Sequence, residues 1–359
     1  MRFRTAEDDA ALAQAVAELL AKEASPEVVR AGWPGGPAER VDAVWRKLAE
    51  MGVTATLVPE AAAAPGPGPG HERGPVRGHE PGHEPGHDLG LGLDENALPP
   101  LLRELGRSAL PVPVVETVAV GAPLLAAAAA PQLDGVLAGR LLLTASLSAD
   151  ATAPVPFAER ADLFVLRAGA SLRLYERGEL RLDPVASVDG SRALARVTAP
   201  AAGGLLLAEG AAAVDRAWQR GVLGTAALLV GLSERMVELT VGYVRQRHQF
   251  GAPVGSFQAV KHALADAHLA VRFAAPAVLA AGSAQAGGDP RAAVATSLAK
   301  VLASDAARLV ARTAVQCHGA IGYTTEYDLH LYAKRAWALA AAWGDPTDHR
   351  DLLAHALAL

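Results

Sequence analysis

The chain has 359 residues, of which 51% are apolar and only 4% aromatic, so a large core must be built mainly from Ala, Leu and Val. Thirty-three Lys and Arg against 38 Asp and Glu give a net charge of −5, which argues against a basic nucleic-acid binder. One cysteine, Cys317, excludes an intrachain disulfide. The first residues lack a signal-peptide pattern, and the most apolar stretch, 110–130, contains Glu116 and prolines, so we expect a cytoplasmic protein with no membrane span.

Apolar residues recur at the three- and four-residue spacing of a helix in three early segments. These positions are Leu12, Val16, Leu19 and Leu20; Val41, Val44, Leu48 and Met51; and Leu98, Leu101, Leu102 and Leu105. Gly52 and Gly106 follow the second and third segments, as helix-ending glycines do. The pattern predicts a helical amino-terminal domain over residues 1–122.

Residues 62–90 interrupt this domain with a Pro- and Gly-rich segment that repeats the letters GHEP. Such a composition buries too little apolar surface to offset its chain entropy, so we predict a disordered insertion. His71, His79, His83 and His87 alternate with acidic residues there, which could also indicate a metal-binding tract. We favour a low-complexity insertion and predict no metal site, because no rigid scaffold would fix the ligand geometry.

The spacing of apolar residues changes after the amino-terminal domain. Residues 123–210 contain short runs bounded by Gly, Asp or Pro, which predict a small antiparallel β-domain. Residues 211–359 return to long Ala-rich helical patterns, which predict a four-helix bundle. The four expected helices cover 211–247, 256–286, 290–318 and 325–343, and a short helix follows Pro346. The fold class is therefore predicted to be α+β.

The segment RQRHQFGAPVGSFQAVKHALADA, residues 245–267, places Arg247 and Phe250 at the end of one helix. A Gly/Pro turn follows, and Ser256 can cap the next helix. A fixed cation beside a helix amino terminus favours a phosphate-bearing ligand. A plain helical corner with a solvated arginine fits the spacing equally well.

The segment QCHGAIGYTTEYDLHLYAKRA, residues 316–336, ends a helix at Gly319 and turns at Gly322. Thr324 or Thr325 can cap the following helix. Glycines of this kind allow close approach of the backbone to a flat or phosphorylated ligand. An ordinary turn between two helices is the alternative.

These two motifs, in a chain ordered as helical, β and helical domains, resemble the acyl-CoA dehydrogenases. LAEMGVTATLVPE at 48–60 and LLRELGRSALPVPVVETV at 101–118 extend the resemblance along the chain. It implies a flavoprotein that binds FAD between the β-domain and the carboxy-terminal helices, with a neighbouring subunit completing the site.

The resemblance also implies individual FAD contacts. The Arg of the family motif RxxFG, here Arg247, would reach the FAD pyrophosphate with Phe250 beside it. The Gln of the following helix matches Gln258. Gln316 and Gly319 match residues that meet the adenylate half of FAD across the subunit interface.

The sequence departs from the family at the catalytic base, the carboxylate that removes the α-proton of an acyl thioester. Members carry it at either of two positions, which correspond here to Trp343 and to the neighbourhood of Gly221. Neither position holds an acid. Glu326 and Asp345 are the weak remaining candidates, and each is also explained as a helix-end residue.

Three further differences point to a specialised branch of the family. Ala320 replaces the second glycine of the usual Gly-Gly pair, and of a common flavin-binding segment of the β-domain only Thr144 remains as a possible flavin contact. The ending GDPTDHR, residues 344–350, resembles members that assemble mixed tetramers, in which one subunit supplies the base and its partner is degenerate.

Two functional hypotheses follow from the resemblance. The chain is an FAD-dependent oxidoreductase that dehydrogenates an acyl-CoA and passes electrons to a separate acceptor, with an unusual base. Alternatively, it is a non-catalytic subunit that completes the FAD site of a related chain in a homo- or hetero-oligomer, a dimer or a tetramer. A helical scaffold unrelated to flavin is the third, blander interpretation.

Overall fold

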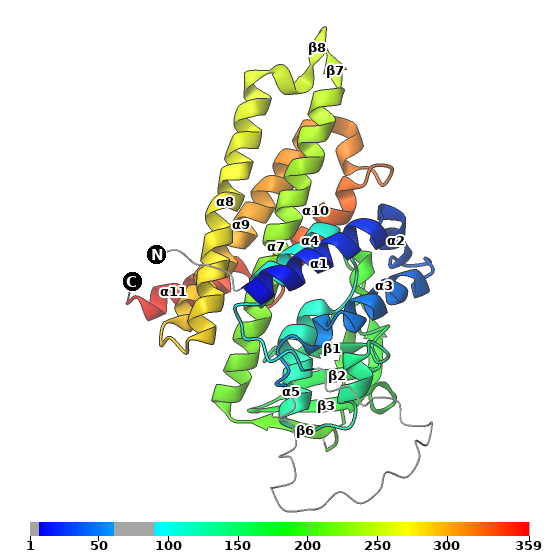
Figure 1. Ribbon diagram of the computed structural model, residues 1–359, viewed down its shortest axis with the longest axis vertical. Coiled ribbons are helices and arrows are strands. Elements are labelled where there is room, and N and C mark those ends of the chain that lie inside the picture. The colour runs from blue at the N-terminus through cyan, green and yellow to red at the C-terminus, as the bar shows by residue number, and fades with distance from the viewer. Residues whose placement is uncertain (1–6, 61–89, 201, 359) are drawn as a thin grey trace, which may run out of the picture.

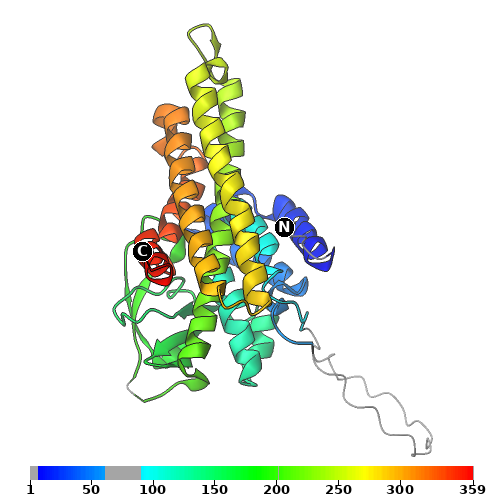
Figure 2. The same ribbon diagram turned by 90° about the vertical axis from the view of Figure 1, so that its left-hand side faces the viewer.

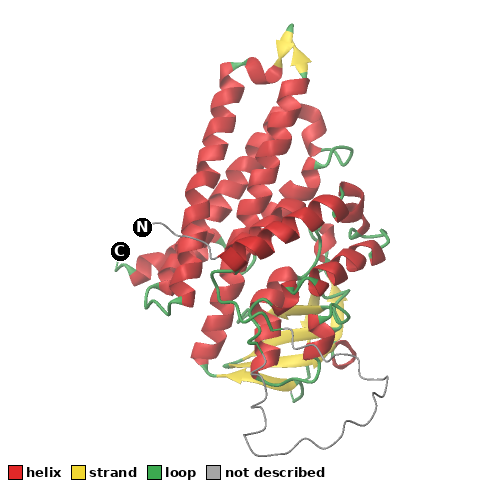
Figure 3. Cartoon of the chain, in the orientation of Figure 1, coloured by secondary structure: helices red, strands yellow, loops and turns green. Residues whose placement is uncertain are grey.

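The computed structural model describes residues 7–60, 90–200 and 202–358. Apart from Gly90, the predicted insertion at 62–90 and its histidines lie outside the described residues. Helices, a small β-unit and long helices follow one another along the described chain, as predicted (Figure 3). The small sheet lies at one end of the long axis, and the tip of a helical bundle lies at the other (Figure 1).

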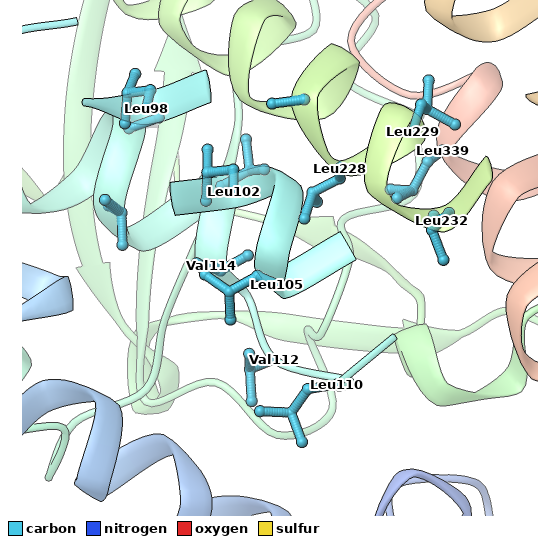
Figure 4. Packing of buried hydrophobic residues seen from close by; sticks show 14 of the residues in the cluster. Leu98, Leu102, Leu105, Leu110, Val112, Val114, Leu228, Leu229, Leu232 and Leu339 are labelled. Atoms are coloured by element: carbon cyan, nitrogen blue, oxygen red, sulfur yellow. The ribbon is translucent and has the colours of Figure 1, made fainter. Parts of the chain in front are cut away.

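The amino-terminal helices are α1 (Glu7–Glu23), α2 (Pro26–Ala31), α3 (Glu39–Glu50), α4 (Leu98–Ser108), α5 (Ala122–Ala127) and α6 (Leu133–Leu137), with a π-helical segment at Val115–Gly121. Among them, α4 makes the main contact with the bundle, through α7 (Ala211–Gln246). Leu102 and Leu105 of α4 are buried near Leu228 of the bundle (Figure 4). A Cβ at Gly106 would lie 2.3 Å from the Leu228 carbonyl oxygen, so only glycine permits this close approach.

The β-unit contains a four-stranded sheet in the order β1-β2-β3-β6 and a separate pair, β4 with β5. The strands are β1 (Leu143–Ser146), β2 (Leu163–Ala168), β3 (Ser171–Glu176), β4 (Arg181–Pro184), β5 (Ala195–Thr198) and β6 (Leu205–Glu209). The prediction of a purely antiparallel domain is wrong for one pair, because β1 runs parallel to β2. Residues 147–162 form a long crossover rather than a hairpin, so β2 re-enters in the direction of β1.

The bundle consists of long helices close to the predicted ranges. They are α7 (Ala211–Gln246), α8 (Gln258–Ala286), α9 (Ala292–His318) and α10 (Leu329–Ala340), followed by α11 (Pro346–Ala356). The 36 residues of α7 run from the sheet to the tip, about 54 Å at the helical rise per residue (Figures 1 and 2). This helix therefore connects the β-unit to the tip of the bundle (Figure 1).

Helix α8 presents an apolar surface that the described part of the chain leaves exposed. It is the one described helix long and apolar enough to span a membrane, judged by length and composition alone. It packs against α9 and α7 and carries Lys261, Asp266 and Arg272 along its length. Leu269 and Phe273 lie one helical turn apart and are 52% and 72% exposed, which suits a contact with another helix.

Candidate functional site

The first predicted motif forms the tip of the bundle. Strands β7 (His248–Gln249) and β8 (Ala252–Pro253) make a hairpin whose two turn residues, Phe250 and Gly251, have φ values of 53° and 77°. Phe250 is 94% exposed in a left-handed conformation that a bulky residue rarely adopts. A large apolar ring held in solvent at this cost is suited to a partner molecule.

Arg247 follows the last residue of α7 and is exposed. Its carbonyl oxygen accepts a hydrogen bond from the Val254 N–H at 2.7 Å, which holds it beside the start of α8. The prediction that Ser256 caps α8 is wrong, because its hydroxyl donates to the Pro253 carbonyl and Phe257 takes the capping position without a side-chain bond. The amino terminus of this 29-residue helix is therefore open, and Gln258 is exposed there.

The second predicted motif turns at the end of α9. Gly319 has φ 67° and ψ −143°, a conformation available essentially to glycine alone. A 3-10 turn follows at Gly319–Tyr323, and α10 begins only at Leu329. The predicted capping by Thr324 or Thr325 is therefore wrong, since the Thr324 hydroxyl donates within the turn, to the Ile321 carbonyl at 3.0 Å.

An aromatic stack brings the two motifs to the same end of the bundle. The rings of Tyr243 on α7 and His318 on α9 stack with centroids 4.4 Å apart, and Tyr327 packs on both. The His318 Nδ1 bonds to the Ala314 carbonyl oxygen at 2.7 Å, while burial lowers the pKa of His318 and keeps the ring neutral. Gln316 is exposed two residues before His318 on α9, and neither Tyr243 nor His318 was identified as a site residue from the sequence.

The tip has the properties of an anion site. It combines an exposed guanidinium with the uncapped amino terminus of a long helix. Arg247 has no ion-pair partner within the part of the chain that the structure describes. These groups fit the pyrophosphate of a dinucleotide, because backbone N–H groups, a helix dipole and an arginine all favour phosphate oxygens.

A cavity of about 390 Å³ lies at the other end of α7, between the β-unit and the carboxy-terminal helices. Ser146 and Leu147 at the end of β1 line one side, and Trp218 of α7 and Trp343 line another. Thr144 does not line it; it is fully buried and its hydroxyl donates to the Pro156 carbonyl oxygen, so its expected role as a flavin contact is not supported.

Trp343 and Gly221 meet in this region; the resemblance matches the first to one base position of the family and the second to the neighbourhood of the other. A Cβ built on Gly221 would lie 2.4 Å from two ring carbons of Trp343, so the indole packs directly on the Gly221 backbone. Trp218 lies against the same indole with ring centroids 5.4 Å apart. The space between the two positions is filled by the Trp343 side chain.

Buried polar groups fix the turn that carries Trp343. Lys300 is fully buried, and its Nζ donates to the carbonyl oxygens of Ala340 and Gly344 at 3.0 and 2.8 Å. His349 Nε2 lies 2.9 Å from the Trp343 carbonyl oxygen. Trp343 itself has φ 57°, so these contacts hold it in a strained backbone conformation.

The two weak candidates for a base lie elsewhere. Asp345 caps α11, accepting from the N–H groups of Thr347 and Asp348 at 2.6 and 3.0 Å, and these bonds lower its pKa. Glu326 is exposed in the loop before α10, next to the stacked Tyr327. Neither carboxylate lines the cavity.

A buried charged cluster behind the cavity was not predicted. Arg335 of α10 is paired with Asp189 and donates to the Ser191 hydroxyl at 2.6 Å. Glu116 of the π-helical segment is buried close to Arg335, to Arg192 and to the Trp343 indole. The cluster connects the amino-terminal helices, the β-unit and the bundle. In the sequence, the one indication of it is an acidic residue, Glu116, within the apolar run PVPVVETV.

No group of three or more His, Cys, Asp or Glu side chains suited to a metal ion is found within residues 7–60, 90–200 and 202–358. The histidine tract of the insertion falls outside these ranges.

Comparisons with known proteins agree with the fold and the motifs. Residues 208–358 match the family model described as acyl-CoA dehydrogenase, C-terminal domain. Acyl-CoA dehydrogenase IpdE2 of Mycobacterium tuberculosis is 31% identical over 345 residues, covering 94% of this chain and 93% of the relative. The ChsE4-ChsE5 complex from Mycobacterium tuberculosis matches with a TM-score of 0.80, 21% identity and coverage of 100% and 99%.

The structure of PigA with FAD and proline matches with a TM-score of 0.79, 16% identity and complete coverage of both chains, so it shares the fold. The shared fold alone does not establish the family, whereas the 31% identity to IpdE2 over 94% of this chain does. The chain belongs to the acyl-CoA dehydrogenase family.

Proposed function

We propose that this chain is a non-catalytic subunit of a heteromeric acyl-CoA dehydrogenase, in which its bundle tip completes the FAD site of a related subunit. The reaction of the assembly is the α,β-dehydrogenation of an acyl-CoA, with FAD as the hydride acceptor. The observation that carries the proposal is the packing of Trp343 on Gly221.

The contact between Trp343 and Gly221 matters because the acyl chain of the substrate lies between these two positions in active members of the family. A carboxylate from either position removes a proton from the same carbon, so the acyl chain must pass between them. Here the indole touches the Gly221 backbone and leaves no such passage. Trp343 has a nitrogen that only donates, and glycine has no side chain, so neither can accept the proton.

The cofactor is FAD, and its two halves call for two chains. Trp218 at the cavity and Arg247 at the tip are separated by nearly the whole of α7, about 43 Å along the helix. One FAD molecule is too short to reach both. The tip of one chain therefore serves an FAD molecule whose flavin ring lies on another chain, and the exposure of Arg247, Gln258 and Gln316 supports this arrangement.

The uncovered face of α8 supports assembly with a related chain. Exposed Leu269 and Phe273 form an apolar surface that another long helix would bury. The similar ChsE4-ChsE5 structure is a complex of two different chains. The cytoplasmic location stays a prediction from the sequence.

Visible spectroscopy tests the proposal. We expect the purified chain to be colourless, and to give a flavin band when co-purified with a related subunit that carries a glutamate base. Acyl-CoA should then bleach the band. Rapid bleaching by this chain alone, abolished by Glu326→Gln or Asp345→Asn, would refute the non-catalytic assignment.

The contribution of the tip is tested by Arg247→Ala in the mixed complex. Loss of a charge-assisted contact should weaken FAD binding by about 10- to 150-fold, corresponding to roughly 1.5–3 kcal/mol. Arg245→Ala is the matched control, because Arg245 is also exposed at the end of α7 but faces another side of the helix. Equal FAD affinity in both variants would contradict the role given to the tip.

A further inference from the structure

Under the proposed function, the cavity beside Trp343 takes no part in catalysis. One residue that lines it, Arg192, has no ion-pair partner among the described residues. Arg192 is the one cation among the described residues that line the cavity. Its Nε is buried without a hydrogen-bond partner, and the described chain provides no ion pair to its guanidinium. Arg192 as a whole is half-buried, and leaving one of its five donors buried without a partner is a costly arrangement.

The charges around Arg192 do not balance it. Asp189 is committed to Arg335 and to Ser191, and it affects Arg192 only through space. Burial raises the pKa of Glu116, which favours the uncharged carboxylic acid in that position. Burial lowers the pKa of Arg192, Arg335 acts in the same direction, and Asp189 and Glu116 oppose the shift.

The walls of the cavity indicate what else the ligand must carry. Trp218 and Trp343 form an aromatic side, and Pro154, Pro156 and Leu194 supply further apolar surface. A volume of about 390 Å³ suits a small molecule. With a single cation inside and Asp348 among the lining residues, the cavity favours one negative charge over a phosphate dianion.

We propose that this cavity binds a small apolar monocarboxylate, with the carboxylate on Arg192 and the apolar body against the two tryptophans. The planar fork of arginine matches a carboxylate through two parallel hydrogen bonds. The inference rests on the proposed function, because a chain active in dehydrogenation would need this region for its own flavin and substrate.

Benzoate is a suitable probe, since it joins one carboxylate to a flat apolar ring. We expect saturable quenching of tryptophan fluorescence when benzoate is added to the full chain without FAD, because two of the five tryptophans line the cavity. Arg192→Met should weaken binding by about 10- to 100-fold. Arg196→Met is the matched control, because Arg196 is exposed on β5 and does not line the cavity.

Arg192→Lys keeps the charge without the fork and should bind benzoate with intermediate affinity, so it tests the proposal even if the methionine variant does not fold. The proposal is overturned if benzoate does not bind saturably, if Arg192→Met or Arg192→Lys binds it as well as the unmodified chain, or if riboflavin displaces it. The last result would assign the cavity to a flavin ring. Because no FAD and no second subunit are present, failure here is independent of the flavin band of the mixed complex.

Discussion

Lys300 makes the stability of the fold depend on pH in a direction that can be calculated. The side chain is fully buried in α9, and its ammonium group donates to two carbonyl oxygens in and beside the turn that carries Trp343. Burial lowers its pKa to about 7, with Arg308 acting in the same direction and Asp345 and Asp348 opposing it. An unfolded chain would hold this proton with an ordinary lysine pKa of about 10.4.

The sign follows from proton binding. Above pH 7 the unfolded chain binds a proton that the folded chain has released, so raising the pH favours the folded state. Between pH 7 and 8.5 the two pKa values give an increase of about 1.6 kcal/mol in the free energy of unfolding. This window lies below the ordinary pKa of tyrosine and reaches that of cysteine only at its upper limit. Burial raises the pKa values of Cys317 and Tyr332, so titration of these two groups would act in the opposite sense.

Urea unfolding followed by circular dichroism at pH 7.0 and 8.5 measures this difference. Lys300→Met should abolish it, because methionine has a similar length and no titration. Lys261→Met should retain it, since Lys261 is exposed on α8. An unmodified chain that is equally stable at the two pH values, or a Lys300→Met variant that keeps the full difference, would refute the reasoning.

Three further predictions use the buried polar groups. Asp189→Asn leaves the Arg335 guanidinium buried without its counter-ion and should lower the free energy of unfolding by about 3–5 kcal/mol; a urea midpoint within error of the unmodified chain would count against a buried ion pair. Burial lowers the pKa of His330 and His349, so the unfolded state binds more protons than the folded state as the pH falls. The free energy of unfolding should therefore decrease between about pH 7 and 5.5, and His330→Phe should reduce this decrease. Equal urea midpoints over that range would contradict this. In the mixed complex Trp343→Glu should leave the rate of bleaching by acyl-CoA unchanged, because the flavin ring lies on the related subunit; a gain that approaches the roughly 10²–10⁴-fold of a positioned base, absent in Trp343→Gln, would contradict the non-catalytic assignment.

The long helices were predictable because their pattern is local and extended. The bundle ranges agree with the structure to within a few residues, since apolar positions repeat over many turns in α7, α8 and α9. The start of α10 at Leu329 was missed because its loop is stabilised by contacts with Tyr243 and His318, which lie on other helices. The parallel pairing of β1 with β2 depends on a long crossover, for which the sequence has no short-range signal.

The motifs of the candidate site could be recognised in the sequence, but the sequence did not show that they lie at opposite ends of helix α7. Arg247 and Gln316 were identified by their sequence neighbourhood, yet a pattern cannot show that both lie at a tip far from Trp343. The contact of Trp343 with Gly221 joins residues that are remote in the sequence. Glu116 and Asp189 come from separate domains and acquire meaning only when Arg335 brings them into one cluster.

Under the proposed function, the separation along α7 explains how this chain can lack the base and still serve the FAD site of a partner. The tip depends on the Tyr243–His318 stack and the open end of α8, whereas Trp343 depends on Lys300 and His349. Substitutions at sites that share no contacts act independently. A change at Trp343 or Gly221 therefore leaves the phosphate-binding groups of the tip intact. Each FAD in a two-chain assembly needs one carboxylate and one tip, and these can come from different chains.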